Sequence, residues 1–274
     1  MPNGYEVKET ILSARNVGVS YGDTPVLKDL NLSIKNITRP GVAQGQVVGL
    51  LGPSGVGKTT LFRCLAGLMK PDSGDILVTD KMIPVERGMV GVVAQHYPLF
   101  AHRTVLGNLQ VAGAQAGMPA GEAKQKSLTI LTRFGIAEQA NSYPAQLSGG
   151  QRQRVAIAQQ FMCSDHFLLM DEPFSGLDLI AIQKVSEFIC EIAQTDELKT
   201  IVLVTHDIDA ALAVCDTIWL LGRDIGEDGK KIPGARIQQI VDLAERGIAW
   251  RTDVQNSPEF LATLGEVRTA FTKL

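Results

Sequence analysis

The glycine-rich octapeptide GPSGVGKT at residues 52–59 constrains this chain more than any other feature. It fits the pattern GxxxxGK[ST], follows an apolar run that predicts a strand at 46–51, and precedes a predicted helix at 59–68. Glycines leave successive backbone N–H groups free to surround a polyphosphate, and the lysine reaches the β- and γ-phosphates. A plain glycine-rich turn is the alternative. The sequence predicts a nucleotide site formed by Gly52, Pro53, Ser54, Gly55, Val56, Gly57, Lys58, Thr59 and Thr60.

An apolar stretch that ends in two carboxylates, FLLMDE at residues 167–172, is the expected companion of this loop. A strand here would deliver Asp171 to its carboxyl end, where ligands bind in open α/β sheets. Asp171 could then hold Mg²⁺ through water, beside the hydroxyl of Thr59. Glu172 is the candidate to orient or deprotonate an attacking water. Carboxylates that only face solvent are the alternative, which the nearby phosphate loop makes the weaker one.

A second anion-binding pattern, LSGGQRQR, begins at residue 147. It predicts a helix start with Arg152 and Arg154 just inside. Free N–H groups at a helix start suit a phosphate, and glycines let a ligand come close. A glycine cap on an ordinary helix is the alternative. One chain with two phosphate-binding turns poses a question that a single nucleotide per chain does not answer.

Together, the phosphate loop, the FLLMDE stretch and LSGGQ make this chain resemble the ATP-binding subunit of an ABC transporter, over about residues 13–221. LSGGQ at 147–151 is that family's signature motif and occurs here without departure. The resemblance implies that two nucleotide-binding domains pair head to tail, with each ATP between the phosphate loop of one and the signature of the other. The residues that would serve the partner's ATP are Ser148, Gly149, Gly150 and Gln151.

The resemblance assigns roles to four more positions. Gln95, after a predicted strand, corresponds to the Q-loop glutamine that senses Mg²⁺ and water. Asp178 lies in SGLD, which resembles the D-loop that crosses the dimer interface. His206 matches the switch histidine that contacts the γ-phosphate, and Tyr21 matches the aromatic that stacks on adenine. The catalytic candidates are therefore Glu172, His206, Lys58 and Gln95, and the candidate metal ligands are Thr59, Gln95 and Asp171.

The order of predicted elements indicates an α/β fold of the P-loop NTPase type, with a mainly parallel core sheet, an N-terminal antiparallel β subdomain and an inserted α-helical subdomain. The two antiparallel strands are expected near 17–22 and 26–34, and the last helix at 257–271, capped by Ser257. We expect one domain over residues 1–274, with the core at about 11–95 and 164–222, the helical insertion at about 96–163, and a C-terminal extension at about 223–274. Neither this extension nor the loop at 36–45, which is longer than usual in the family, receives a role.

The composition argues against several classes of partner and site. With 26 basic and 29 acidic residues the formal net charge is −3, which gives no reason to expect nucleic-acid binding. The four cysteines form no CxxC pair, so neither a zinc site nor a disulfide framework is indicated, and a reducing compartment is expected. The N-terminus lacks the apolar core of a signal peptide, and the longest uncharged stretch, 104–121, is too polar to span a bilayer.

The function these features favour is the ATP-hydrolysing subunit of a multi-subunit importer that uses ATP and Mg²⁺. The motifs DEPFSGLD and VTHDIDAALAVCD resemble those of importers of the nitrate/sulfonate/taurine type. The resemblance implies a second ATP-binding subunit, identical or related, transmembrane permease subunits that contact residues 96–104, and indirectly a substrate-binding protein. The chain would then lie at the cytoplasmic face of the inner membrane. A soluble ABC ATPase and the ATPase of an exporter or lipid-trafficking system are the alternatives, and the transported solute cannot be read from this chain.

Overall fold

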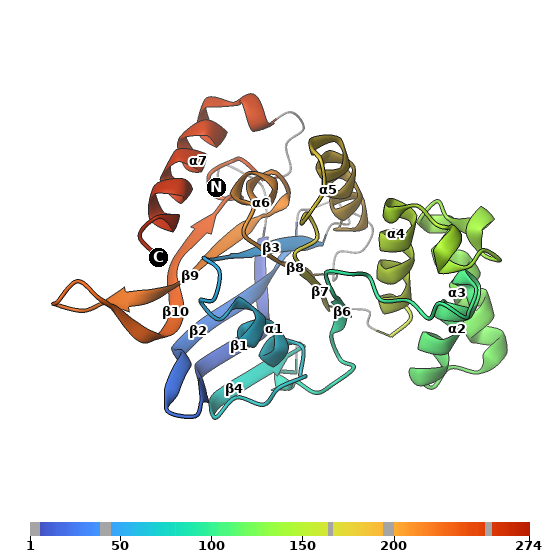
Figure 1. Ribbon diagram of the computed structural model, residues 1–274, viewed down its shortest axis with the longest axis horizontal. Helices are drawn as coiled ribbons and strands as arrows, with labels where there is room; N and C mark the ends of the chain where they lie inside the picture. Colours follow the sequence, from blue (N-terminus) through green and yellow to red (C-terminus); the bar gives the residue numbers. More distant parts are fainter. Residues whose placement is uncertain (1–5, 39–44, 80, 164–166, 194–199, 250–253) are drawn as a thin grey trace.

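A single ten-stranded sheet runs through the molecule, in the order β5-β4-β1-β2-β10-β9-β3-β8-β7-β6. The computed structural model describes residues 6–38, 45–79, 81–163, 167–193, 200–249 and 254–274. Figure 1 shows helices on both faces of this sheet and a separate group of helices beyond its β6 edge. The predicted fold class, with a core sheet, an antiparallel N-terminal part and a helical insertion, is confirmed. Residues 39–44 of the predicted 36–45 loop lie outside the described residues.

The centre of the sheet is parallel. Its strands, in spatial order, are β9 (Thr217–Ile225), β3 (Gln46–Leu51), β8 (Thr200–Thr205), β7 (Phe167–Asp171) and β6 (Gly91–Val93). Every residue of β3 and β8 is buried, as expected for parallel strands that are covered on both faces. The carboxyl ends of β3, β7 and β8 therefore meet at one edge of the sheet.

Helices cover the two faces of this parallel part. Side chains alternate along β3, so that Val47 and Leu51 join a core with α5 (Leu179–Ala193) and α6 (Ile208–Val214), while Val48 and Leu50 join a second core with α1 (Lys58–Leu65). Alternation with a period of two is the normal geometry of a strand. It explains why an almost continuous apolar run was needed at the residues that precede the phosphate loop.

The antiparallel part consists of β1 (Glu6–Tyr21), β2 (Thr24–Thr38), β4 (Ser73–Val78) and β5 (Ile83–Pro84). The two predicted N-terminal strands are confirmed, and both are longer than their apolar cores. A tight turn at Gly22, whose φ is 59°, joins them. This turn places Tyr21 at the end of β1, next to its partner Thr24.

The strand β10 (Lys231–Asp242) was not predicted. It pairs with β9 in antiparallel register and meets β2 at Ala235 and Leu27, so it joins the antiparallel and parallel parts into one sheet. Pro233 and Gly234 interrupt its sequence, and only Gly234, Ala235 and Val241 along it are buried. Such a strand carries no alternating signal, because its pairing partners and not its own pattern hold it in place.

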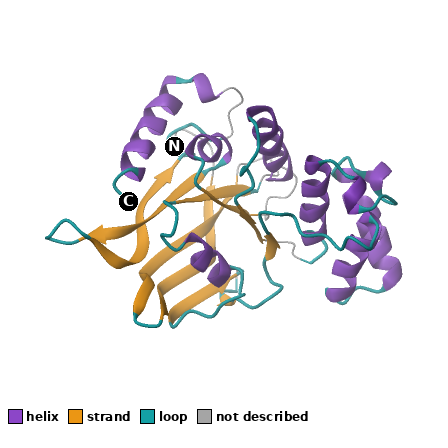
Figure 2. Ribbon diagram, in the orientation of Figure 1, coloured by secondary structure: helices purple, strands orange, loops and turns teal. Residues whose placement is uncertain are grey.

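The helical group contains α2 (Val105–Gln115), α3 (Ala120–Arg133) and α4 (Gly149–Gln160), seen as the purple cluster at the right of Figure 2. Aromatic rings connect it to the core: Phe134 meets Phe161 and Phe188 edge-on, at centroid distances of 5.2 and 5.3 Å. The guanidinium of Arg154 lies 4.1 Å from the centroid of the Phe188 ring, a cation–π contact. These contacts fix α3 and α4 against α5.

The C-terminal helix α7 (Pro258–Phe271) begins as predicted, with the Ser257 hydroxyl accepting a hydrogen bond from the backbone N–H of Phe260. It packs on α6, where Arg268 pairs with Asp209 at 2.8 Å. A short 3-10 turn, Val254–Asn256, precedes it. None of the helices in the described ranges is long and apolar enough to cross a membrane.

Candidate nucleotide-binding site

The phosphate loop connects β3 to α1 and packs against two other strands, β2 and β9. Gly57, at the start of α1, has a φ of 119°, which strongly favours glycine, and a Cβ there would meet the Val26 side chain at 3.1 Å. A Cβ on Gly52 would lie 2.7 Å from the carbonyl oxygen of Leu221 on β9. The buried side chain of Val56 anchors the middle of the loop. Two glycines are thus required by close packing of the loop itself.

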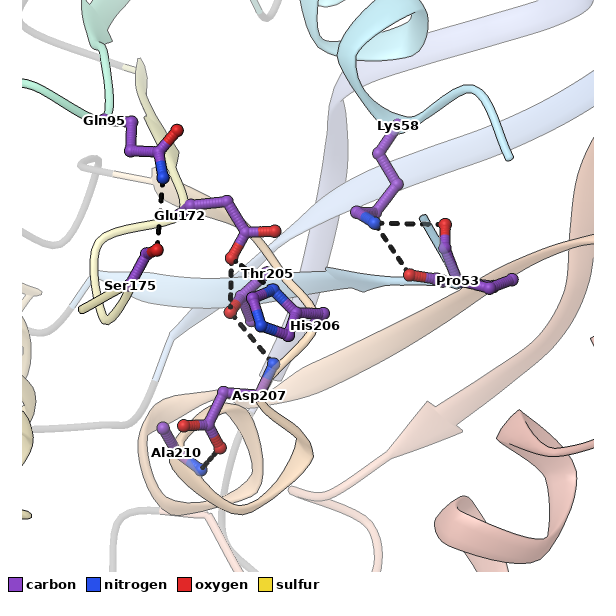
Figure 3. Close-up of polar contacts among 10 residues, drawn as sticks. Pro53, Lys58, Gln95, Glu172, Ser175, Thr205, His206, Asp207 and Ala210 are labelled. Carbon is purple, nitrogen blue, oxygen red and sulfur yellow. Dashed lines mark hydrogen bonds and ion pairs between the residues drawn. The ribbon is translucent and has the colours of Figure 1, made fainter. Parts of the chain in front are cut away.

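Lys58 lies over this loop, as Figure 3 shows. Its Nζ donates hydrogen bonds to the carbonyl oxygens of Gly52 at 2.7 Å and Pro53 at 3.2 Å. Burial lowers the pKa of Lys58, and the nearby carboxylates of Glu172 and Asp171 oppose that shift without cancelling it. The carbonyl oxygens of the loop therefore accept the hydrogen bonds that the Lys58 ammonium group would give to phosphate oxygens.

The two predicted carboxylates follow one another at the carboxyl end of β7. Burial raises the pKa of Asp171, the charge of Glu172 raises it further, and Lys58 lowers it in part. The backbone N–H of Glu172 donates to the Val204 carbonyl oxygen at 2.7 Å. The φ of Glu172 is 50°, a conformation that costs a non-glycine residue on the order of 1 kcal/mol. This backbone turn allows the Glu172 side chain to reach the end of β8.

The end of β8 meets Glu172 with two side chains. The Thr205 hydroxyl donates to Glu172 Oε2 at 3.2 Å, and His206 Nδ1 lies 2.9 Å from the same oxygen (Figure 3). His206 is 61% exposed, whereas the Glu172 side chain is 17% exposed. Thr205 also accepts a hydrogen bond from the backbone N–H of Asp207, so it fixes the turn that carries His206. Sequence reasoning missed Thr205, although a hydroxyl at the carboxyl end of a buried strand is a usable signal.

The predicted Q-loop residue Gln95 contacts the D-loop segment. Its Nε2 donates to the Ser175 hydroxyl at 3.1 Å (Figure 3). Close by, the Tyr97 hydroxyl donates to the Pro173 carbonyl oxygen at 3.2 Å, and burial raises the pKa of Tyr97 to about 12. The segment after β6 is thus tied to the segment that follows Glu172. Asp178, at the end of that segment, caps α5 by accepting from the backbone N–H of Ala181 at 2.8 Å.

The signature residues lie apart from this cluster, and Tyr21 lies on the surface. Figure 1 shows α4, which carries the signature, well away from α1. Ser148 caps α4 through a reciprocal pair of hydrogen bonds with Gln151, at 2.9 and 3.3 Å. Tyr21 stands at the end of β1 with 54% of its surface exposed. The structure therefore brings together Lys58, Asp171, Glu172 and His206, and it holds the signature residues apart from them on α4.

The site offers oxygen ligands for a divalent cation. The exposed hydroxyl of Thr59, the carboxylate of Asp171 and the amide oxygen of Gln95 suit the preference of Mg²⁺ for oxygen. In the part of the chain that the structure describes, no group of three or more His, Cys, Asp or Glu side chains could hold a metal. These residues fit a metal ion that arrives with phosphate groups and keeps several waters, and they do not form a closed metal cage.

Comparison with known proteins gives a consistent picture. The family profile described as ABC transporter matches residues 36–175. The glutamine transport ATP-binding protein GlnQ of Geobacillus stearothermophilus is 41% identical over 206 residues, which are 72% of this chain and 81% of that protein. The spermidine/putrescine import ATP-binding protein PotA of Aggregatibacter actinomycetemcomitans is 37% identical over 223 residues, and the match spans 58% of its length. The structure of cbiO1 from Clostridium perfringens, part of the cbiONQ transporter complex, superposes with a TM-score of 0.72 at 27% identity, covering 96% of this chain and all of that one.

Proposed function

This chain belongs to the family of ABC transporter ATP-binding subunits, and on that premise we propose that it is the energy-coupling ATPase of a multi-subunit importer. GlnQ is named for transport of glutamine and PotA for import of spermidine and putrescine, and FbpC of Rhizobium etli, 41% identical over 218 residues, is named for import of Fe³⁺ ions. The motifs DEPFSGLD and VTHDIDAALAVCD support a finer placement near the nitrate/sulfonate/taurine group. The solute itself is selected by other subunits.

The observation that carries a two-chain ATP site is the freedom of the signature glycines. Gly149 and Gly150 both lack a positive φ, and a Cβ added to either would meet nothing within 4 Å. Glycine weakens a helix, so these two positions disfavour α4 without any benefit inside this chain. A phosphate that approaches from outside the subunit gives the glycines a purpose. We infer that Ser148, Gly149, Gly150 and Gln151 bind ATP held by the phosphate loop of a second subunit.

On the phosphate loop of each subunit, Lys58 would exchange its bonds to the Gly52 and Pro53 carbonyl oxygens for bonds to the β- and γ-phosphates. Backbone N–H groups of the loop would surround the phosphates, and the exposed ring of Tyr21 would stack on adenine. Asp178 would act at the interface between the two subunits. Mg²⁺, where bound to Thr59, Asp171 and Gln95, supplies positive charge that neutralises the phosphate oxygens.

Glu172 is the proposed group that orients the attacking water, with His206 toward the γ-phosphate. In the structure the two residues hydrogen-bond to each other, with Thr205 on the same oxygen. The attacking water must hydrogen-bond to the Glu172 carboxylate to pass its proton there, and the bonds from Thr205 and His206 both occupy Oε2, one of its two oxygens. We therefore propose that closure of the dimer draws His206 toward phosphate and leaves Glu172 to the water.

A permease contact is proposed at residues 96–104, after the Q-loop strand. The Phe100 side chain is 41% exposed and its ring lies 6.1 Å from that of His102. The fully buried Asn108 holds this loop from below: its Oδ1 accepts from the Phe100 N–H at 2.7 Å, and its Nδ2 donates to the carbonyl oxygens of Phe100, Arg103 and Thr104. A rigid loop that shows an aromatic side chain is suited to pass motion to another subunit.

The remaining assignments follow from this arrangement. We propose a single domain, with the core at about 11–95 and 164–222, the helical insertion at about 96–163 and the C-terminal extension at about 223–274. The partners would be a second copy or a close relative, permease subunits and, through them, a substrate-binding protein. The subunit would be peripheral to the cytoplasmic face of the membrane and would bind no nucleic acid.

Complementation between two inactive variants tests the shared site. A Lys58→Ala chain has a defective phosphate loop, and a Ser148→Arg chain has a blocked signature. A mixed dimer contains one intact site, formed by the loop of the second chain and the signature of the first, so an equal mixture should recover about one quarter of the native ATPase activity. Absence of recovery, with the native chain active and both variants folded, would contradict a site shared between subunits.

A further inference from the structure

Arg223, outside every motif discussed above, contacts the phosphate loop directly. It lies on β9, and its guanidinium NH2 donates a hydrogen bond to the Gly55 carbonyl oxygen at 3.0 Å. Gly55 has a φ of 74° and its Cβ position is open, so the loop has little steric restraint of its own at this point. An anchor from outside the loop is the means by which this peptide can be held in one orientation.

The bond acts on a single peptide plane, because the carbonyl of Gly55 and the N–H of Val56 belong to the same rigid unit and point in opposite directions. The N–H of Val56 faces the Pro53 carbonyl oxygen at 3.4 Å, and that oxygen also accepts from Lys58 Nζ at 3.2 Å. A continuous chain of hydrogen bonds thus runs from β9 through the loop to the lysine. Rotation of the Gly55–Val56 peptide would disturb both the turn and the acceptor that Lys58 uses.

The surroundings of Arg223 direct it toward the loop. It lines an open groove of about 670 Å³ between β9, β10 and α7. The acidic side chains of this groove already have cationic partners, since Asp224 pairs with Arg236 at 3.0 Å and Glu266 with Arg246 at 2.6 Å. These pairs weaken the attraction of either carboxylate for the guanidinium of Arg223. The Nε of Arg223 is buried and has no hydrogen-bond partner within the described residues, so this group contributes unfavourably to the stability of the folded chain.

The strand that carries Arg223 is itself firmly placed. β9 pairs with β3, the strand before the loop, and with β10 on its other side. On the adjoining Gly222, an added Cβ would lie 2.5 Å from the Leu274 side chain, so the end of the chain packs directly on β9. The Gln238 amide of β10 donates to the Gly222 carbonyl oxygen at 3.3 Å. The C-terminal region therefore supports the residue that holds the loop.

We propose that Arg223 is a positioning residue for nucleotide binding: it fixes the Gly55–Val56 peptide so that the phosphate loop and Lys58 are ready for the phosphates. This inference rests on the proposed use of the loop for ATP. In this proposal the C-terminal region has a role: β10 and Leu274, which follows α7, pack against β9 and so keep Arg223 in contact with the phosphate loop. Arg223 touches no reacting atom, and its effect is on the affinity for nucleotide and not on the hydrolytic step.

Titration of the full-length chain with a fluorescent ATP analogue, together with steady-state hydrolysis, tests the proposal. Arg223→Ala and Arg223→Gln should raise the Kd and the KM for ATP about fivefold, a typical loss for one charge-assisted hydrogen bond that is partly exposed, and leave kcat nearly unchanged. Arg223→Lys should restore part of the affinity, because an ammonium can still donate to Gly55. The matched control is Lys230→Ala in the turn between β9 and β10, which removes an exposed cation that pairs with Asp228 and does not contact the loop.

Each outcome is decisive. An unchanged Kd in folded Arg223→Ala, or an equal rise in Lys230→Ala, would overturn the proposal. A fall in kcat with unchanged KM would also overturn it, because a positioning role on the phosphate loop acts in the ground state. If the native chain bound no ATP analogue, the proposed function would fail instead, so the two failures are distinguishable. Urea unfolding of all four variants identifies any that are not folded.

Discussion

Replacement of the signature glycines by alanine should raise the stability of the isolated subunit and lower its rate of ATP hydrolysis. Gly149 and Gly150 are the first two residues of α4, and an added Cβ would contact nothing within 4 Å in this chain. Alanine at these positions lowers the conformational entropy of the unfolded chain and favours the helix. Within one subunit, therefore, no contact opposes the change.

The magnitude follows from the open environment. Each Gly→Ala change should raise the free energy of unfolding by about 0.5 kcal/mol, less than in a helix interior because these positions lie in the first turn. For a chain of this size the double variant, with about 1 kcal/mol, should melt roughly 2 °C higher. In the proposed two-chain site, each Cβ would stand where the partner's phosphate approaches. Because the added Cβ would keep the phosphate away from these backbone N–H donors, ATP hydrolysis should fall about a hundredfold, as it does when another oxyanion donor is lost.

Two assays on the same protein separate these effects. Urea unfolding measures the stability, and phosphate release at several protein concentrations measures hydrolysis. Gly121→Ala is the matched control, because Gly121 is also the second residue of a helix, α3, and its Cβ position is equally open. It should gain similar stability and keep full activity. Full activity in Gly150→Ala would refute the idea that the signature faces a nucleotide, and destabilisation of that variant would refute the claim that this chain does not need the glycine.

Three further predictions concern the cluster around Glu172 and the core. Glu172→Gln should still bind ATP, because it changes no group of the phosphate loop. It should hydrolyse ATP at least about a hundredfold more slowly, as measured by single-turnover phosphate release. Near-normal turnover would exclude Glu172 as the base. Burial raises the pKa of Asp171 above 3.8, so the folded chain binds the carboxyl proton more tightly than the unfolded chain does. The stability that this proton contributes is fully present below the pKa of the unfolded chain, and it is lost as the pH rises through the raised pKa of the folded chain. Asp171→Asn cannot ionise and should therefore resist urea better than the native chain at neutral pH, by a margin that shrinks on acidification, and a margin independent of pH would contradict the shift. Phe134→Ala should lower the free energy of unfolding by about 4 kcal/mol, because the ring is buried between Phe161 and Phe188. Phe134→Leu should lower it less. Equal losses of the two variants in urea unfolding would show that the ring contacts contribute little.

The sequence alone determined the features that depend on neighbouring residues. The phosphate loop, the acidic end of FLLMDE and the capped start of α4 are each set by residues a few positions apart, so glycine, carboxylate and cap chemistry identify them locally. The apolar runs of β3, β7 and β8 predict buried parallel strands because each strand must fill both faces of the sheet. This local information was sufficient for the fold class and for a list of candidate site residues.

The tertiary structure decided which of those residues meet. The contact of Glu172 with both Thr205 and His206 depends on β7 lying beside β8, a pairing of segments more than thirty positions apart, as the hydrogen-bonded pairs show. The strand β10 has no pattern of its own and exists because β9 and β2 supply partners for its backbone. Arg223 reaches Gly55 across 168 positions, and no local rule links an arginine on one strand to a loop after another. Long-range hydrogen bonds of this kind arise only when the sheet has assembled, because their geometry is set by strand order and not by spacing along the chain.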